Sequence, residues 1–109
     1  NAIENYYPGD AYVDYVGLDG FNFGNPWLSY SQIFANALTK LYGYNKPVYI
    51  FSMGSADGTK KAAWITDALS QIYSNPRIKG FVWFNENKEE NWLIWSNPDA
   101  LKAFQSSLR

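Results

Sequence analysis

The sequence predicts an α/β protein in which three β-strands alternate with three α-helices. The clearest strand lies in Lys46–Ser55, an apolar run with β-branched and aromatic residues that is opened by Pro47 and closed by Gly54. A strand covered on both faces need not alternate apolar and polar residues, so this run fits a buried strand. Helical apolar patterns precede and follow it. Because right-handed crossovers join consecutive strands through helices, we expect the three strands to be parallel.

The first strand–helix unit begins with Tyr12–Asp19, whose Tyr, Val and Leu residues predict a strand that ends at about the last of these positions. The stretch that follows is rich in Gly, Asn and Pro and is expected to be a loop. Ser29 and Gln32 fit a capping box, which predicts a helix from Ser29 to about Tyr42. Gly43 then fits a left-handed residue just after the helix end.

The second unit has its strand at Pro47 to about Met53, and the small residues that follow are expected to form a loop. Lys60–Ser74 is predicted to be the second helix, because its apolar residues recur at helical spacing. Asn75-Pro76 ends this helix, since the residue before a proline disfavours the helical conformation. The residues expected on its buried face are Ala62, Ile65, Leu69 and Ile72.

The third unit has a strand at Ile78–Phe84, followed by a charged loop. Asn97 is expected to cap the last helix, with proline at its first position and a carboxylate near its positive end. Its expected buried face is Leu101, Phe104 and Leu108.

Three strand–helix units are too few to form a closed barrel and leave a sheet with open edges. A closed (β/α)₈ barrel needs eight units in about 250 residues. A free sheet of three strands exposes two edges that can pair with another chain. The chain of 109 residues is therefore expected to be one single fragment, either part of a larger barrel or a piece that self-associates through its open edges.

Composition excludes several functions. The net charge is −1 and no basic block is present, so nucleic acid is not an expected partner. No apolar stretch approaches the roughly 20 residues that span a membrane, and no signal peptide is visible at the start of the chain. The chain has 0 Cys and 0 His, which excludes disulfides, thiol nucleophiles and histidine bases and leaves no expected metal or cofactor. The 19% aromatic content fits proteins that stack on sugars, or a core rich in rings.

Several segments together resemble the carboxyl-terminal part of glycoside hydrolase family 26, the endo-β-mannanase family. The segment from Pro8 through Asn22 resembles the family's sixth barrel strand, and Lys46–Phe51 resembles the seventh. Lys60–Ile65 resembles the helix after that strand. Ile78–Asn85, with the Asn87-Lys88 and Asn91-Trp92 pairs, resembles the eighth strand and its loop.

The resemblance implies a (β/α)₈ barrel that hydrolyses β-linked polysaccharide with retention, using two carboxylates about 5–5.5 Å apart. The family's acid/base glutamate belongs to an earlier strand and is expected to be absent here. The nucleophile position at the end of the seventh strand matches Ser52, a neutral hydroxyl with no histidine to activate it. The family's tyrosine beside the nucleophile matches Phe21, which lacks the hydroxyl. No glutamate lies between Asn5 and Asn85, and Asp57 is too far into its loop to replace the missing nucleophile.

The candidate substrate-binding residues follow from these strand ends. Asp19 either hydrogen-bonds a sugar hydroxyl or caps backbone amides of the next loop. Trp83 is interpreted as part of the sugar floor, with barrel core as the alternative, and Trp92 either lines a subsite or packs on the last helix, as does Trp95. Glu86 and Glu89 do not define a paired-carboxylate or calcium site. The predicted binding set is Asp19, Phe21, Trp83, Asn85 and Trp92, with Glu86, Asn87 and Lys88 as further loop residues that contact glycan or are only solvated.

The functional prediction is the carboxyl-terminal portion of a β-mannanase-like glycoside hydrolase, inactive as an isolated chain. The alternatives are a degenerate barrel that binds glycan without cutting it, and a structural fragment that dimerises. Mannan is the expected polysaccharide, with mixed-linkage glucan and β-xylan open. The expected partners are the glycan and either the missing barrel half or a second copy, and the resemblance implies a secreted or cell-surface protein.

Overall fold

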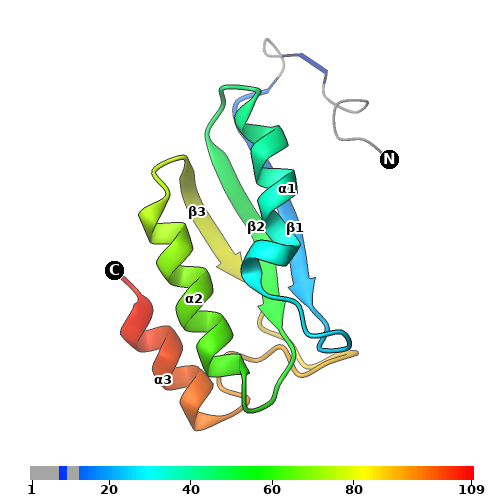
Figure 1. Ribbon diagram of the computed structural model, residues 1–109, viewed down its shortest axis with the longest axis vertical. Helices are drawn as coiled ribbons and strands as arrows, with labels where there is room; N and C mark the ends of the chain where they lie inside the picture. The colour runs from blue at the N-terminus through cyan, green and yellow to red at the C-terminus, as the bar shows by residue number, and fades with distance from the viewer. Residues whose placement is uncertain (1–7, 10–12) are drawn as a thin grey trace.

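The computed structural model describes residues 8–9 and 13–109 and confirms the α/β class with parallel strands. The described elements alternate as β1, α1, β2, α2, β3 and α3 (Figure 1). The sheet order is β1-β2-β3, and both strand pairs are parallel. The elements are β1 (Val16–Asn22), α1 (Tyr30–Tyr42), β2 (Val48–Ser55), α2 (Lys61–Ser74), β3 (Ile78–Trp83) and α3 (Pro98–Ser107).

The carboxyl end of β1 lies further along the chain than the sequence predicted. The strand was expected to end near Asp19, but it continues to Asn22 and so takes in the start of the expected loop. The ladder with β2 continues through Phe21 and Asn22, and the Ala56 amide donates to the Asn22 carbonyl at 2.8 Å. The predicted start of this strand at Tyr12 lies outside the described residues.

The end of β2 is corrected in the same way. The strand was expected to stop at about Met53, with Gly54 in a loop, yet Gly54 and Ser55 pair with Phe21 and Asn22. Both strands continue past their predicted ends because pairing in the ladder holds the two backbones in the extended conformation. Ser52 consequently lies three residues inside β2 rather than at its end.

Local capping signals are mostly confirmed. The Ser29 hydroxyl accepts a hydrogen bond from the Gln32 amide and the Gln32 side chain accepts one from the Ser29 amide, so the capping box is present. Asn97 caps α3 through the Ala100 amide, at 2.7 Å. Gly43, however, is right-handed with φ −67°, and the prediction of a left-handed glycine there is wrong. The positive φ of this connection falls on Asn45 instead.

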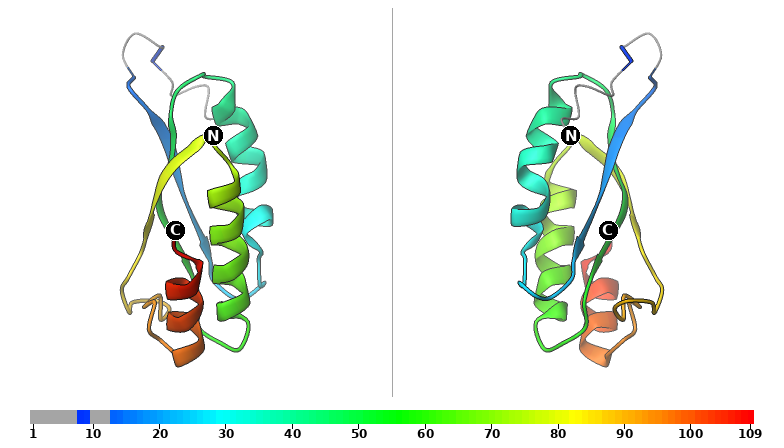
Figure 2. Two further views of the ribbon diagram at one scale, coloured as in Figure 1. Left: turned by 90° about the vertical axis from the view of Figure 1, so that its left-hand side faces the viewer. Right: turned by 90° about the vertical axis from the view of Figure 1, so that its right-hand side faces the viewer.

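The core lies between the sheet and one layer of helices. Figure 2 shows the sheet edge-on, with α1 and α2 on one side and no described helix on the other. Val48, Ile50 and Met53 of β2 pack toward the helices and are fully buried. In α3 the buried residue is Ala100, while Leu101 and Phe104 are half-buried; Leu108, predicted to be buried, is exposed because it lies beyond the helix end.

The opposite sheet face, here called the open face, carries apolar side chains without a helix to cover them. Tyr15, Tyr49 and Phe51 form an edge-to-face group with ring centroids 5.5 and 5.8 Å from Tyr15. Val82 is 58% exposed and Phe51 is 46% exposed. The strands at the two edges of the described sheet are β1 and β3. Among the described residues, none of the helices has the length and apolarity that crossing a membrane requires.

Candidate functional site

An aromatic cluster lies where the open face meets the carboxyl ends of the strands. Phe21 of β1 lies 5.6 Å from Phe84, which follows β3, and 5.3 Å from Trp92 in the next loop, measured between ring centroids. Phe23 adds an edge-to-face contact with Trp92 at 5.1 Å and is 53% exposed. Parallel α/β folds form ligand sites at the carboxyl ends of their strands. Aromatic side chains at such an edge can stack on sugar rings.

Gly54 makes this cluster possible. A β-carbon at this position would lie 3.1 Å from Trp92 Cε3 and 3.4 Å from Phe21 Cδ1. Both rings therefore close directly over the backbone of β2, and a larger side chain would push the Trp92 ring away. The glycine that was expected to belong to a loop instead supports the floor of the site.

Asp19 and Ser52 are partners across the β1–β2 ladder. Side chains two residues apart on a strand share a face, so Asp19 lies on the same face as Phe21, the open face. Asp19 is exposed, and within the described part of the chain its carboxylate accepts no hydrogen bond from a backbone amide. Ser52 is half-buried beside it. The open face thus brings one carboxylate and one hydroxyl together next to the aromatic cluster.

The loop that carries Trp92 is folded on itself by backbone hydrogen bonds. The Trp92 amide donates to the carbonyl of Glu86 at 2.9 Å, and Asn87 and Asn91 form an isolated antiparallel bridge. The Asn85 side chain accepts a hydrogen bond from the Ile94 amide at 2.8 Å. The amide oxygen of Asn85 therefore holds the loop in shape.

Lys61 anchors this loop from the start of α2. Its side chain is fully buried, and its ammonium donates to the carbonyls of Asn91 at 3.1 Å and Leu93 at 2.7 Å and to the Ser96 hydroxyl at 2.8 Å. Burial lowers the pKa of Lys61 to about 8, against the opposing charge of Asp57. A single lysine thus fixes the segment between Trp92 and α3.

Asp57 completes the anchor from the loop after β2. Its carboxylate accepts hydrogen bonds from the Ser96 hydroxyl and the Asn97 amide, both at 2.7 Å. Burial raises the pKa of Asp57, but the hydrogen bonds from Ser96, Gly58 and Asn97 and the charge of Lys61 lower it overall. Asp57 thus serves the loop anchor through its hydrogen bonds to Ser96 and Asn97. Among the described residues no group of three or more acidic residues is arranged to hold a metal ion.

Comparison with known proteins identifies the family. The model of glycosyl hydrolase family 26 matches residues 1–108 of the chain. This chain belongs to glycosyl hydrolase family 26. Endoglucanase H of Acetivibrio thermocellus is 41% identical over 111 residues, a match that covers 94% of this chain and 12% of that relative. The chain thus spans only a small part of the length of its curated relative. The resemblance stated from the sequence is confirmed, and the chain is a portion of a family 26 glycoside hydrolase.

The structure brings some of the predicted family 26 site residues together and separates others. Asp19, Phe21 and Ser52 share the open face, and Trp92 closes over Phe21. Trp92 is 1% exposed, so its ring is packed within the cluster. Trp83 lies on the helix-covered side, 6.0 Å from Trp64 and 6.3 Å from Phe104, and its indole N–H donates to the Trp92 carbonyl at 2.7 Å.

Three further loop residues of the family 26 chain have different surroundings in the structure. Trp95, which sequence analysis placed either in a subsite or against the last helix, has an exposed ring. Glu89 accepts a hydrogen bond from the Trp92 indole at 3.3 Å. Phe23, which lies in the stretch expected to be a loop, belongs to the aromatic cluster. The available signal was a large apolar side chain in a stretch otherwise rich in Asn and Gly.

Asn22 is a functional support that sequence analysis missed. It is fully buried at the end of β1, where its amide donates to the Ser55 hydroxyl at 3.0 Å. Its oxygen accepts hydrogen bonds from the amides of Gly24 and Leu28, at 3.2 and 2.9 Å. One side chain therefore closes the loop that positions Phe23.

Replacing Asn22 with alanine should destabilise the protein by about 2–4 kcal/mol, since two backbone amides and a serine hydroxyl lose their partner. Urea unfolding followed by tryptophan fluorescence measures the change. Asn36, exposed on α1, gives the matched control, and its change to alanine should stay within about 0.5 kcal/mol. Equal stability of the two variants would contradict a bonding role for Asn22.

Proposed function

We propose that this chain forms the carboxyl-terminal part of a family 26 catalytic barrel that acts on internal bonds of a β-linked polysaccharide. The observation that carries the proposal is the aromatic cluster of Phe21, Phe23, Phe84 and Trp92 at the carboxyl ends of parallel strands, beside Asp19 and Ser52. Phe21, Phe23 and Phe84 would form part of the floor of a glycan cleft, with the buried Trp92 ring packed behind them. Trp83 contributes by holding the Trp92 backbone and not by touching sugar.

The three strand–helix units would be units six to eight of a (β/α)₈ barrel. Two features support this assignment: the strands are parallel with helices on one side only, and the open face carries apolar rings that a barrel interior would cover. In that arrangement β1 and β3 pair with strands supplied by the rest of the protein. Self-association through the same edges is the alternative, and it predicts a mass that rises with concentration in light scattering.

Two polysaccharides are the leading substrates. The family resemblance favours β-1,4-mannan, whereas the similarity to a protein named endoglucanase favours a β-glucan. The aromatic floor suits either, because stacking on ring faces does not depend on one hydroxyl configuration. Mixed-linkage glucan and β-xylan are further candidates. The protein is proposed to act outside the cell or at its surface, where such polymers occur.

A second candidate function is glycan binding without hydrolysis. The position that matches the family nucleophile is Ser52, and its neighbour in the ladder is Asp19 rather than a second glutamate. Phe21 packs with apolar rings and has no hydroxyl to donate to a nucleophile. On this proposal the isolated chain is inactive, and the parent protein retains the aromatic cleft as a recognition surface.

The deciding experiment restores the two matched positions in the full-length protein. The double substitution Ser52→Glu with Phe21→Tyr should raise reducing-end release from mannan or β-glucan by about 100-fold over Ser52→Gln with Phe21→Tyr, because only the carboxylate stabilises positive charge in the transition state. Release is measured on mannan, mixed-linkage glucan and xylan in parallel.

Each result has a distinct meaning. If hydrolysis requires the restored carboxylate, Ser52 occupies the position from which the family nucleophile has been lost. That result supports glycan binding as the function of the unmodified protein. Hydrolysis by the unmodified protein would show that its nucleophile lies elsewhere. If no variant is active but saturable glycan binding is retained, glycan binding is the function. If neither hydrolysis nor glycan binding is found, the proposed glycan cleft is wrong.

A further inference from the structure

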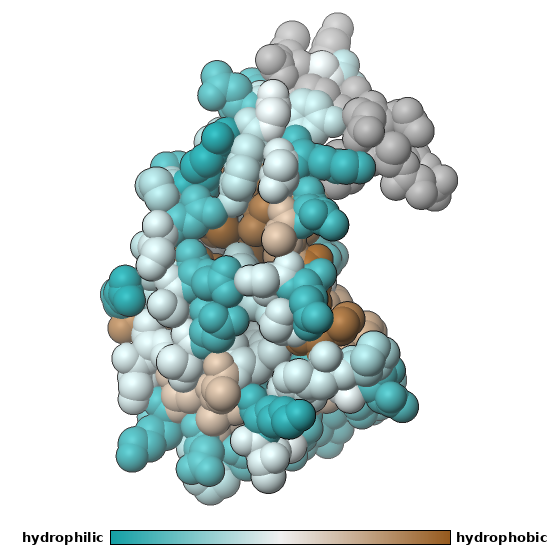
Figure 3. Space-filling view, in the orientation of Figure 1, coloured by the Kyte–Doolittle hydropathy of each residue, from teal (hydrophilic) through white to brown (hydrophobic). Residues whose placement is uncertain are grey.

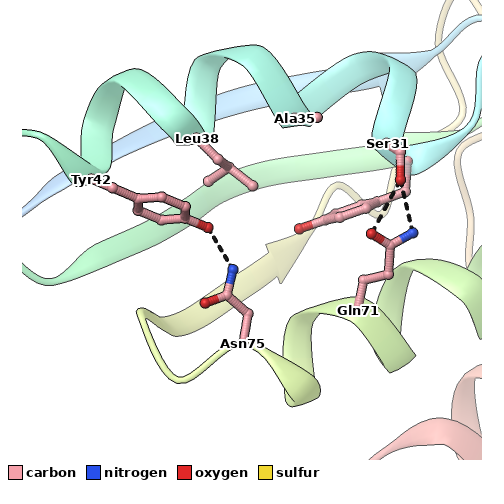
Figure 4. Close-up of a pocket in the computed structure, with 7 residues that line it drawn as sticks. Ser31, Ala35, Leu38, Tyr42, Gln71 and Asn75 are labelled. Carbon is pink, nitrogen blue, oxygen red and sulfur yellow. Dashed lines mark hydrogen bonds between the residues drawn. The ribbon is translucent and has the colours of Figure 1, made fainter.

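A cavity of about 220 Å³ lies in the helix layer, on the side of the sheet away from the open face. It is bounded by α1, by α2 and by Asn75 just after α2 (Figure 4). Its lining residues are Tyr30, Ser31, Ala35, Leu38, Tyr42, Gln71 and Asn75. Figure 3 shows a hollow with apolar atoms at its base on this face of the molecule. The cavity is therefore separate from the proposed glycan cleft.

Tyr30 lines this cavity, and its buried hydroxyl has no hydrogen-bond partner among the described residues. The residue is 3% exposed, and its ring packs 4.9 Å from the ring of Phe34. Leaving a buried hydroxyl without a hydrogen bond is unfavourable, so native structures rarely keep one. An orphaned group of this kind in a cavity wall indicates that something else supplies the missing bond.

The side chains that line the cavity around Tyr30 are uncharged, while the Asp67 carboxylate just outside the lining accepts hydrogen bonds from the Gln71 amide. The Ser31 hydroxyl and the Gln71 amide hydrogen-bond each other, and the Tyr42 hydroxyl accepts a hydrogen bond from the Asn75 amide (Figure 4). No Lys, Arg, Asp or Glu belongs to the lining residues. Hydroxyls, amides and the two tyrosine rings suit an uncharged ligand that has several hydroxyls and an apolar ring face.

We propose that this cavity binds one pyranose ring of a β-linked glycan, with a sugar hydroxyl bonded to the Tyr30 oxygen. The volume is below the 300–1,000 Å³ or so of pockets that enclose drug-sized ligands, which limits the occupant to a single ring. The site goes beyond the proposed cleft, because it lies on the opposite face of the sheet. It would hold a second point of the polymer against the protein surface.

The test uses the full-length protein labelled with ¹⁵N in glutamine and asparagine, titrated with methyl β-D-glucopyranoside and methyl β-D-mannopyranoside. We expect saturable shifts of the Gln71 and Asn75 side-chain amides. Tyr30→Phe removes only the hydroxyl and should weaken this binding about fivefold or more, the effect of losing one hydrogen bond. Tyr73→Phe is the matched control, because Tyr73 lies on α2 outside this cavity, and it should leave the binding unchanged.

Thermal unfolding without sugar supplies a second readout. Tyr30→Phe should raise the midpoint temperature, since it deletes an unpartnered buried hydroxyl, and saturating glycoside should raise the midpoint of the unmodified protein more than that of the variant. Amide shifts that do not saturate with either sugar, or equal binding by the variant, would overturn the proposal. A lower midpoint for the sugar-free variant would also overturn it, because the hydroxyl would then already be bonded, as to a resident water.

Discussion

Replacing Lys61 with methionine should lower the free energy of unfolding by about 2–4 kcal/mol, because buried carbonyls lose a charged donor. Methionine keeps the apolar stem that packs in the core, so the change removes mainly the ammonium. The carbonyls of Asn91 and Leu93 then have no Lys61 donor, and the loop that carries Trp92 is released from α2. Urea unfolding monitored by tryptophan fluorescence gives the stability change.

Lys60→Met is the matched control for this substitution. Lys60 is exposed and its ammonium lies 6.0 Å from the centre of the Trp27 ring, so its loss should cost no more than about 1 kcal/mol. Limited proteolysis then reports on the loop, which should be cleaved faster in Lys61→Met than in Lys60→Met. Equal stability and equal cleavage would show that Lys61 does not anchor the loop.

The same residue predicts a dependence of stability on pH. The pKa of Lys61 is lowered to about 8 in the folded protein from 10.5 for an unperturbed lysine, because burial disfavours its charge. Between these values the unfolded chain binds more protons at this site than the folded protein, so the Lys61 contribution to unfolding free energy rises with pH. The stability gap between the unmodified protein and Lys61→Met should therefore widen from pH 8 to pH 10. A constant gap would contradict the lowered pKa.

Replacing Trp92 with alanine should cost about 3–5 kcal/mol of stability and abolish glycan binding at the cluster. The ring is nearly fully buried, and it contacts both Phe21 and Phe23. Its removal leaves a cavity over Gly54 and frees the exposed ring of Phe23 to move. Calorimetric unfolding measures the first effect, and affinity electrophoresis in gels containing mannan or mixed-linkage glucan measures the second.

Two companion variants separate packing from recognition. Trp95→Ala removes an exposed tryptophan of the same loop and should change stability by less than about 0.5 kcal/mol. Trp92→Phe retains an aromatic ring and should recover most of the binding, although it loses the hydrogen bond to Glu89. Full glycan retardation by a folded Trp92→Ala variant would show that the cluster is core and not a binding surface.

Local sequence signals predicted much of the architecture. The capping box at Ser29 and the cap at Asn97 act within a few positions of the chain, so the sequence alone determined where α1 and α3 begin. The strand–helix alternation likewise determined that the sheet is parallel.

Tertiary structure decided the strand ends and the use of individual side chains. Gly54 extends β2 only because Phe21 lies opposite it, and Trp83 turns to the helices because the pleat of β3 places it there. Lys61 and Asn22 bond to groups up to 35 and 33 positions away along the chain, so no local pattern reveals them. The physical reason is common to these cases: ladder pairing, burial and hydrogen-bond partners belong to pairs of residues brought together by folding, whereas capping and periodicity belong to one segment.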